Sequence, residues 1–381
     1  MHQYNFLIVS DMHVGRSDDA NNSTRLTIET PDIPVHENPF ESLKEFIANN
    51  DMSFDGIINL GDLTNRGLIA GFNLGIRMMR ELALIYNCPL VYTPGNHDFC
   101  YGYAKGPVSY LKSMANYPTD DANANSTFWS KGFCLFRIKK INILICNSGK
   151  DYLKIEDKDN VPIFDDYYCN DLDDYLKNEL KEGINIAIVH HHVIQHSDVA
   201  ENANYNSNDI IDHADRFLEV LKKYHFCCVL HGHKHLARYT LIDNVAIMAC
   251  GSLSAIENVR ICDERNYFHI LRLYDENTVP KGIIKSYYFM PQKGWLDIVD
   301  KNFSVKSTYA FGYSLDISKL STDFIGFLGP ETPFVKKDNL FETYPELCMM
   351  TEHDITSLKQ SMNSQGYDLS INGSDVFIFK K

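Results

Sequence analysis

The sequence predicts an α/β protein with strands buried on both faces and a small α+β appendage after them. Five short apolar runs, uninterrupted by polar residues, are typical of strands covered on both sides. They are residues 6–9, 56–60, 89–92, 184–189 and 227–230. Amphipathic helical patterns separate several of these runs, and strands that alternate with helices indicate an α/β sheet. The helical segments are residues 39–49, 74–85, 171–180 and 209–224.

Later segments predict a second sheet and a separate C-terminal unit. Residues 238–247, 267–273 and 281–289 are further strands, including hairpins, that could complete the second sheet of a sandwich. After about residue 300 the sequence has no further cluster of ligand-type residues. We therefore expect a main domain at 1–300 and an appendage at 301–381. A helix at 354–362 and strands at 367–371 and 376–380 follow there. Because this region is more acidic than basic, we favour a structural or interaction role over a winged-helix-like grip on DNA.

Composition excludes several classes of protein. The 381 residues are 44% hydrophobic and 23% charged, ordinary values for a globular chain and unlike those of disordered or fibrous proteins. Thirty-six basic and fifty acidic residues give a net charge of −14, which argues against coating nucleic acid or an anionic membrane by bulk electrostatics. An anionic substrate remains possible, because bound metal ions can reverse the local sign of charge.

Targeting and cysteine patterns favour a reducing compartment. The N-terminus has no basic segment before its short apolar run, and no stretch approaches the ~20 apolar residues of a membrane span. The ten cysteines include no CxxC pair and no zinc-type spacing. We therefore expect free, buried thiols, a cytoplasmic location and no membrane partner.

Polar side chains follow each of the five apolar runs at the point where the run ends. They include Asp11 and His13, then Asp62, Asn96-His97-Asp98, His190-His191-His192 and His231-Gly232-His233-Lys234-His235. Active sites of α/β sheets lie at the carboxyl ends of strands, so we expect these residues to converge. Oxygen and nitrogen ligands without cysteine suit manganese, iron or zinc ions. The two carboxylate oxygens of Asp62 could bridge a pair of ions.

The order and spacing of these residues resemble a known family. The five motifs Asp11-x-His13, Gly61-Asp62-x-x-x-Arg66, Gly95-Asn96-His97-Asp98, a strand-end histidine and Gly232-His233-x-His235 resemble those of calcineurin-like metallophosphoesterases over residues 4–290. The resemblance implies a four-layer α/β/β/α sandwich with the catalytic domain at 1–300. It also implies a cofactor of two divalent metal ions, manganese, iron or zinc.

The resemblance also implies a role for each motif residue. One ion would be held by Asp11, His13, Asp62 and His235, and the second by Asp62, Asn96, His190 and His233. His97 would contact the phosphate and protonate the leaving oxygen, with Asp98 orienting it, and Arg66 is a further candidate for a substrate contact. We favour His190 over His191 as the fourth-motif ligand because His190 ends the apolar run; the proline usual in that motif is absent.

The substrate expected from the resemblance is a small phosphodiester. The compact Gly61-Asp62-Leu63-Thr64-Asn65-Arg66 motif is most similar to the cyclic-nucleotide-phosphodiesterase-like branch, which implies a nucleotide-sized ester attacked by a metal-bridging hydroxide. Three alternatives stay open: a DNA nuclease of the repair-exonuclease type, disfavoured by net charge, a phosphomonoesterase, and a non-catalytic protein-binding scaffold. Aromatic residues in the segment 99–129 either stack on a nucleobase or pack the core of a lid.

Overall fold

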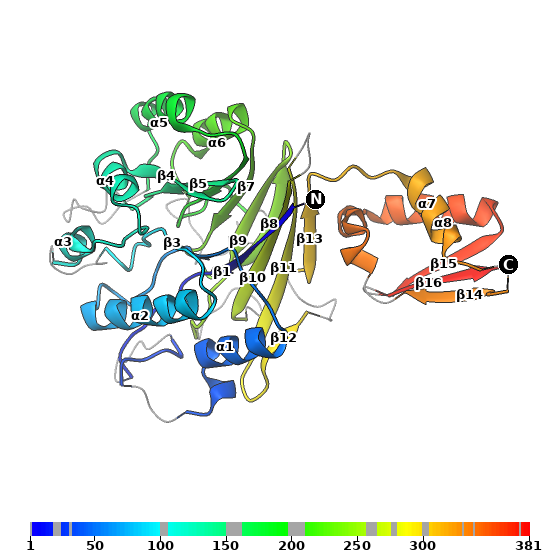
Figure 1. Ribbon diagram of the computed structural model, residues 1–381, viewed down its shortest axis with the longest axis horizontal. Coiled ribbons are helices and arrows are strands. Elements are labelled where there is room, and N and C mark those ends of the chain that lie inside the picture. The colour runs from blue at the N-terminus through cyan, green and yellow to red at the C-terminus, as the bar shows by residue number, and fades with distance from the viewer. Residues whose placement is uncertain are drawn as a thin grey trace.

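The computed structural model of the chain places a large body beside a small C-terminal one (Figure 1). It describes residues 2–17, 24–29, 33–99, 106–149, 162–196, 210–256, 265–275, 280–298, 305–329, 331–337, 340–372 and 375–381.

The first sheet contains β1, the strand that ends in the first predicted motif. Its strands are β1 (His2–Val9), β2 (Gly56–Asn59), β3 (Leu90–Tyr92), β10 (Tyr267–Asp275), β11 (Lys281–Met290), β12 (Gly294–Asp297) and β13 (Thr308–Phe311). The order is β12-β11-β10-β1-β2-β3, and β13 pairs with β11. Since β1, β2 and β3 are parallel, their carboxyl ends lie at one edge, whereas β10 runs antiparallel to β1.

The second sheet repeats this arrangement. Its strands are β4 (Phe133–Ile138), β5 (Ile141–Cys146), β6 (Ile184–Ile188), β7 (Phe226–His231), β8 (Ala237–Ile242) and β9 (Val245–Cys250). The order is β4-β5-β6-β7-β9-β8, with β5, β6, β7 and β9 parallel. The segment 238–247, expected to hold a strand or hairpin, spans most of the β8–β9 hairpin. Asp243 and Asn244 form its two-residue turn, both with positive φ, as the right-handed strand twist favours.

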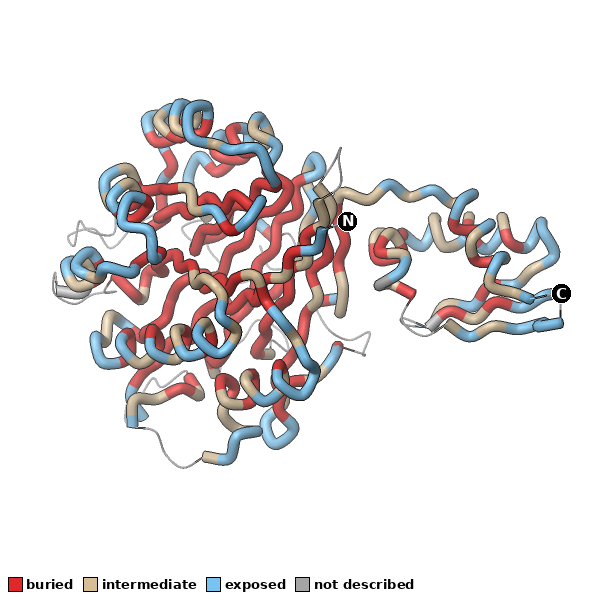
Figure 2. The backbone as a smooth tube through the Cα atoms, viewed as in Figure 1, coloured by how far each residue is buried: buried red, intermediate tan, exposed pale blue. Residues whose placement is uncertain are grey.

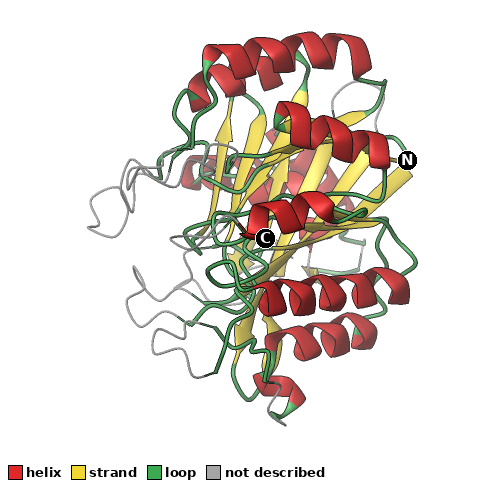
Figure 3. Ribbon diagram, turned by 90° about the vertical axis from the view of Figure 1, so that its left-hand side faces the viewer, coloured by secondary structure: helices red, strands yellow, loops and turns green. Residues whose placement is uncertain are grey.

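Helices cover the outer face of each sheet. The helices of the large body are α1 (Pro39–Asn49), α2 (Ile69–Ile85), α3 (Gly106–Ser113), α4 (Ala122–Lys131), α5 (Asp166–Glu179) and α6 (Ala214–Lys223). Buried residues of α1 and α2 pack with one face of the first sheet, and those of α5 and α6 with one face of the second. Figure 3 shows the strands between these helical layers. The predicted four-layer sandwich is confirmed.

The two sheets pack face to face over a continuous apolar core. Ile8 and Ile58 from the first sheet share this core with Ile186 and Leu230 from the second, and all four side chains are buried. In Figure 2 the buried residues concentrate on the strands and the exposed ones on the outer helices. Every one of the five predicted apolar runs is covered on both sides, which explains why none of them alternates with polar residues.

The aromatic segment before β4 packs into the interior. It contains α3 and α4, and its fully buried Tyr117 stacks on Tyr92 at a centroid distance of 5.3 Å and on Trp129 at 6.2 Å. Phe128 is also fully buried. These described aromatics therefore serve as core residues and not as a platform for a base. Tyr101 and Tyr103 of the same segment lie outside the described residues.

The C-terminal unit has its own small sheet and apolar core. Its elements are α7 (Ile317–Gly326), β14 (Phe334–Lys337), α8 (Glu352–Ser364), β15 (Tyr367–Asn372) and β16 (Asp375–Lys380), with short 3-10 turns η4 (Leu340–Glu342) and η5 (Pro345–Met349). The strand order is β14-β16-β15, and η5 packs against β13 of the large body. The division at residue 300 stays a prediction; β13, which follows it, pairs within the first sheet.

Two further expectations meet the described part of the chain. The eight cysteines within it are free, and all but Cys88 are buried, whereas Cys100 and Cys262 lie outside it. No described helix is both long and apolar enough to cross a membrane.

Candidate metal centre

The predicted motif residues lie together where the strands of both sheets end. The loops after β1 and β2 are joined by main-chain hydrogen bonds from Asp11 to Gly61 (3.0 Å) and from His13 to Asp62 (2.8 Å). Several of these residues adopt left-handed backbone conformations, which cost about 1 kcal/mol or more each for non-glycine residues. They are Asp11, His13, Asp62, Arg66, His233 and His235, with φ between 46° and 87°. Such strain concentrates at functional sites.

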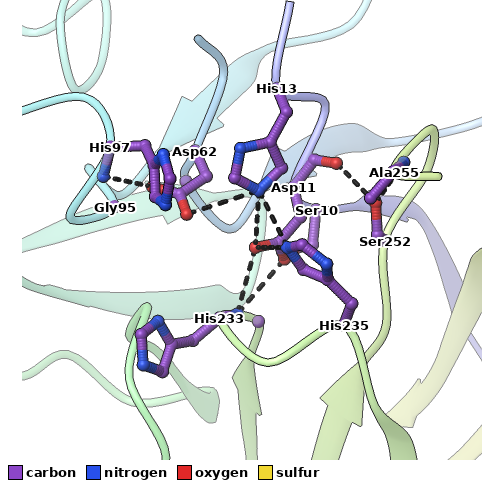
Figure 4. A network of polar contacts seen from close by, with 12 residues as sticks. Ser10, Asp11, His13, Asp62, Gly95, His97, His233, His235, Ser252 and Ala255 are labelled. Carbon is purple, nitrogen blue, oxygen red and sulfur yellow. Dashed lines mark hydrogen bonds and ion pairs between the residues drawn. The ribbon is translucent and has the colours of Figure 1, made fainter. Parts of the chain in front are cut away.

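The first predicted ligand set forms a tight group of facing atoms. His13 Nε2 lies 2.8 Å from His235 Nε2, 3.7 Å from Asp11 Oδ1 and 3.6 Å from Asp62 Oδ2. His235 Nε2 is 3.5 Å from Asp11 Oδ1. Figure 4 shows the His13 and His235 rings turned toward the Asp11 carboxylate. Ligand atoms bound to one cation at about 2.0–2.2 Å lie about 3 Å apart, so these side chains are spaced to share one ion.

The second predicted set lies on the other side of Asp62. Asn96 Oδ1 is 3.1 Å from His190 Nε2 and 3.0 Å from His233 Nδ1, and His190 Nε2 is 3.3 Å from Asp62 Oδ2. His233 uses its main chain differently, because its N–H donates to both Asp11 carboxylate oxygens at 3.2 Å. His233 thus links the two ligand sets. Figure 4 shows its main-chain contact with the Asp11 carboxylate.

Asp62 Oδ2 is the atom between the two sets. It is buried and accepts no hydrogen bond, while Oδ1 of the same side chain accepts the main-chain N–H of His97 at 2.8 Å. Burial alone would raise the pKa of Asp62, but His190 and His97 hold that pKa well below its ordinary value. A buried, ionised oxygen without a donor is costly, and a cation would remove that cost. The structure therefore fits the metal ions that the motifs imply.

Asp11 is a second buried carboxylate that stays ionised. Burial would raise the pKa of Asp11, but the His13 and His235 rings beside its carboxylate hold that pKa well below the ordinary value. The Ser10 hydroxyl donates to its carboxylate, and the Ser252 hydroxyl donates to its main-chain oxygen at 2.7 Å. Ser252 follows β9, a strand end that the sequence analysis did not include; the apolar run before Gly251 was the available signal.

Two glycines allow the loops to approach this closely. A Cβ at Gly95 would lie 2.1 Å from Asp62 Oδ1, and one at Gly232 would lie 2.4 Å from Asp11 Oδ2. Both positions therefore need glycine for lack of space, although their backbone dihedral angles would allow other residues. The Gly-Asn and Gly-His patterns of the motifs have this steric origin.

The two candidate histidines after β6 differ in what their rings contact. His190 Nδ1 donates to the Leu60 carbonyl at 2.7 Å, which leaves a lone pair on Nε2 facing the Asp62 and Asn96 oxygens. Burial opposes protonation of this ring, but Asp62 raises the pKa of His190 to about 9. A proton or a cation is thus needed there. His191 instead pairs its Nδ1 with the Ser148 hydroxyl at 2.7 Å.

His97 lies beside His13 at the edge of the centre. Its Nδ1 accepts the Arg66 main-chain N–H at 3.3 Å, so the neutral ring carries its hydrogen on Nε2. The rings of His13 and His97 meet edge to face, with centroids 4.6 Å apart. Burial lowers the pKa of His97 to about 3, although Asp62 opposes this shift. His97 is therefore a neutral hydrogen-bond donor near pH 7.

The expected roles of Asp98 and Arg66 stay predictions, and the structure shows which contacts each residue makes. The Asp98 carboxylate accepts main-chain N–H groups of Thr64 (3.1 Å) and Gly95 (3.0 Å), so it joins the loops after β2 and β3 and does not bind the His97 ring. Burial, reinforced by the Asp62 charge, raises the pKa of Asp98 to about 7. The Arg66 side chain is exposed, and its main-chain N–H supplies the described contact with His97.

A second group of histidines lies next to the centre and was not assigned by sequence reasoning. His192, His196 and His231 are all buried, and each offers a ring nitrogen within 4.8 Å of the others. We call these three residues the histidine triad. The i, i+4 spacing of His192 and His196 and the strand-end place of His231 were the signals available in the sequence.

Buried carboxylates and imidazoles thus lie together at the strand ends of an α/β sandwich, in groups that could hold metal ions. The family model of the calcineurin-like phosphoesterases matches residues 4–237, more than half of the sequence. The chain belongs to that family. No curated protein sequence matches it.

The solved structures that match this chain are distant from it in sequence. GAP50, the anchor in the inner membrane complex of Plasmodium, is 15% identical with a TM-score of 0.48, covering 86% of this chain and 95% of its own. The phosphopantetheinyl hydrolase of Mycobacterium tuberculosis is 13% identical with a TM-score of 0.38, covering 66% and 90%. A single mutant of Vps29 from Entamoeba histolytica is 10% identical with a TM-score of 0.35, covering 77% and 96%.

Proposed function

We propose that the chain is a dinuclear-metal phosphodiesterase that hydrolyses a small ester of nucleotide size. Asp11, His13, Asp62 and His235 would hold one ion, and Asp62, Asn96, His190 and His233 the other. The observation that carries this proposal is Asp62 Oδ2, a buried, ionised oxygen without a hydrogen-bond donor that lies 3.6 Å from His13 Nε2 and 3.3 Å from His190 Nε2. A carboxylate between two such sets suits a bridging role.

The chemistry depends on charge at the site. When bound, two divalent ions would neutralise the phosphoryl oxygens and lower the pKa of a water molecule toward neutrality. His97 would donate its Nε2 hydrogen to a phosphoryl or leaving-group oxygen, because its Nδ1 is already occupied by the Arg66 N–H. The Leu60 carbonyl fixes the His190 ring with its lone pair toward the ligand oxygens.

A diester fits the described surroundings of the centre. A phosphomonoester carries about two negative charges near pH 7, whereas a diester carries one and needs less compensation beyond the two ions. The histidine beside the first ligand set is the neutral His97, and the Arg66 side chain is exposed. The similarity of the motif at 61–66 to the cyclic-nucleotide-phosphodiesterase-like branch also favours a diester substrate. The net charge of −14 disfavours polymeric DNA as substrate.

The test compares a diester with a monoester. Manganese-loaded protein is assayed with bis-p-nitrophenyl phosphate and with p-nitrophenyl phosphate, and Asp62→Asn prepared in the same way is the blank. We expect higher kcat/KM for the diester and background rates for the variant. A higher value for the monoester would move the chain to the phosphatases. Absence of turnover with both esters in metal-loaded protein would favour a non-catalytic scaffold.

A further inference from the structure

The histidine triad has the arrangement of side chains around a single metal ion. The ring centroids are 4.6 Å apart for His192 and His231, 5.4 Å for His192 and His196, and 6.1 Å for His196 and His231. In a tetrahedral zinc site each imidazole centroid lies about 3 Å from the metal, so the centroids of three ligands lie about 5 Å apart. The observed separations bracket this value.

The triad is built in the interior and not on the surface. His192 and His231 are fully buried and His196 is 4% exposed. His231 Nε2 is buried without a hydrogen-bond partner, and its Nδ1 faces only the Gly232 carbonyl at 3.4 Å. A buried polar nitrogen left in this way is costly unless something binds it.

We propose that His192, His196 and His231 form a third metal site, selective for a zinc-type dication, with an exogenous molecule as fourth ligand. Three imidazoles without a carboxylate favour zinc or a similar late transition metal over manganese or magnesium. The ion would also brace the metal centre, because His192 and His231 lie two residues from His190 and His233 on adjacent turns. These turns are already joined by the Gly232 N–H to the His190 carbonyl at 3.0 Å. This site does not depend on the catalytic proposal.

The experiment measures zinc per chain after dialysis in a zinc buffer, using elemental analysis. The variants are His231→Gln and His196→Gln, and the matched control is His269→Gln, because His269 is equally buried but has both ring nitrogens hydrogen-bonded to Ser286 and Cys250. We expect each triad variant to hold one equivalent of zinc less than wild type and the control to hold the wild-type amount. Unchanged zinc content in folded His231→Gln would overturn the proposal.

Two further measurements keep the test independent of folding and of the catalytic proposal. Asp62→Asn should lose the ions of the metal centre yet keep one equivalent of zinc, which His231→Gln in the same background should remove. If Asp62→Asn held no zinc, the proposed triad site would be refuted, and the proposal of a dinuclear metal centre would still stand. If circular dichroism shows that His231→Gln is unfolded, His196→Gln replaces it.

Cobalt substitution provides a second readout. A four-coordinate histidine site with cobalt absorbs visible light more strongly than a six-coordinate one, and this absorption should disappear in either triad variant.

Discussion

The metal centre and the C-terminal unit differ in what their interiors contain. The centre buries three carboxylates and several imidazoles, with a buried oxygen of Asp62 lacking a donor and several residues in left-handed conformations. The C-terminal unit has an apolar core around Leu320, Phe324 and Leu358, and its α8 starts with a capping box between Thr351 and Asp354. Among the described residues, every group able to hold a metal lies in the large body.

The difference shows where stability has been exchanged for function. Capped helices and an apolar core lower the free energy of the folded chain, so the interior of the C-terminal unit is accounted for by folding alone. Buried ionised groups and strained backbone raise it, and they persist only where the surroundings or a ligand compensate. The metal centre is therefore the part of the molecule whose composition requires a bound partner.

The largest expected effect is at Asp62. Asp62→Asn removes the charge between the two ligand sets, so we expect loss of the centre's ions and fall of phosphodiesterase activity to background. Elemental analysis and a bis-p-nitrophenyl phosphate assay measure both. Because an amide is nearly the same size, the fold should persist, which circular dichroism checks. Full activity in the variant would remove the contrast between the two regions.

His97 should affect rate without affecting metal content. We expect His97→Ala to lower kcat by ~10²–10⁴-fold, the usual contribution of a group that donates a proton or hydrogen bond in the transition state. Arg66→Ala is the matched control, since it keeps the main-chain N–H that contacts His97. It should leave kcat within about tenfold of wild type, well short of the loss expected at His97. Equal turnover of metal-replete His97→Ala and wild type would rule out this role.

Variants of the neighbouring His190 and His191 should show which of the two is the metal ligand. His190→Ala removes the ring whose Nε2 faces Asp62 and Asn96, and we expect it to weaken binding of one ion by at least ~10-fold. His191→Ala removes a ring bonded to Ser148 and should have the smaller effect. Titration of metal-free protein with Mn²⁺, followed by activity, measures both. The reverse order of the two effects would reassign the ligand to His191.

The smallest effect on catalysis should come from the C-terminal unit. Leu358 is fully buried in its core, so Leu358→Ala should lower the free energy of unfolding of that unit by ~2–5 kcal/mol. We expect kcat and metal content to stay at wild-type values. Thermal unfolding, recorded beside the activity assay, tests this. A parallel loss of activity would show that the two regions are coupled through the contact of η5 with β13.

The residues that the sequence placed well are those on uninterrupted strands. Ile57, Ile58 and their equivalents in the other runs are covered on both faces, so an apolar run alone located each strand and the polar residue after it. The β4–β5 hairpin was missed because Lys139 and Lys140 at its turn, with Arg137, interrupt the pattern. The loop contacts of Asp98 depend on where two chain segments meet, which spacing along one sequence does not record.

The histidine triad shows the same limit. Its members come from the loop after β6 and the end of β7, which the parallel pairing of these strands brings together. His192 and His231 stand within motifs whose other histidines were assigned, and His196 lies beyond them. Only the fold places these three rings side by side.

The most direct test of the central claim is turnover of bis-p-nitrophenyl phosphate by metal-free protein titrated with Mn²⁺, with Asp62→Asn titrated in parallel. The account predicts that activity appears in wild type as the metal centre fills and never appears in the variant. Wild-type protein that binds Mn²⁺ at this centre but stays inactive, or a variant that matches wild type, would contradict it.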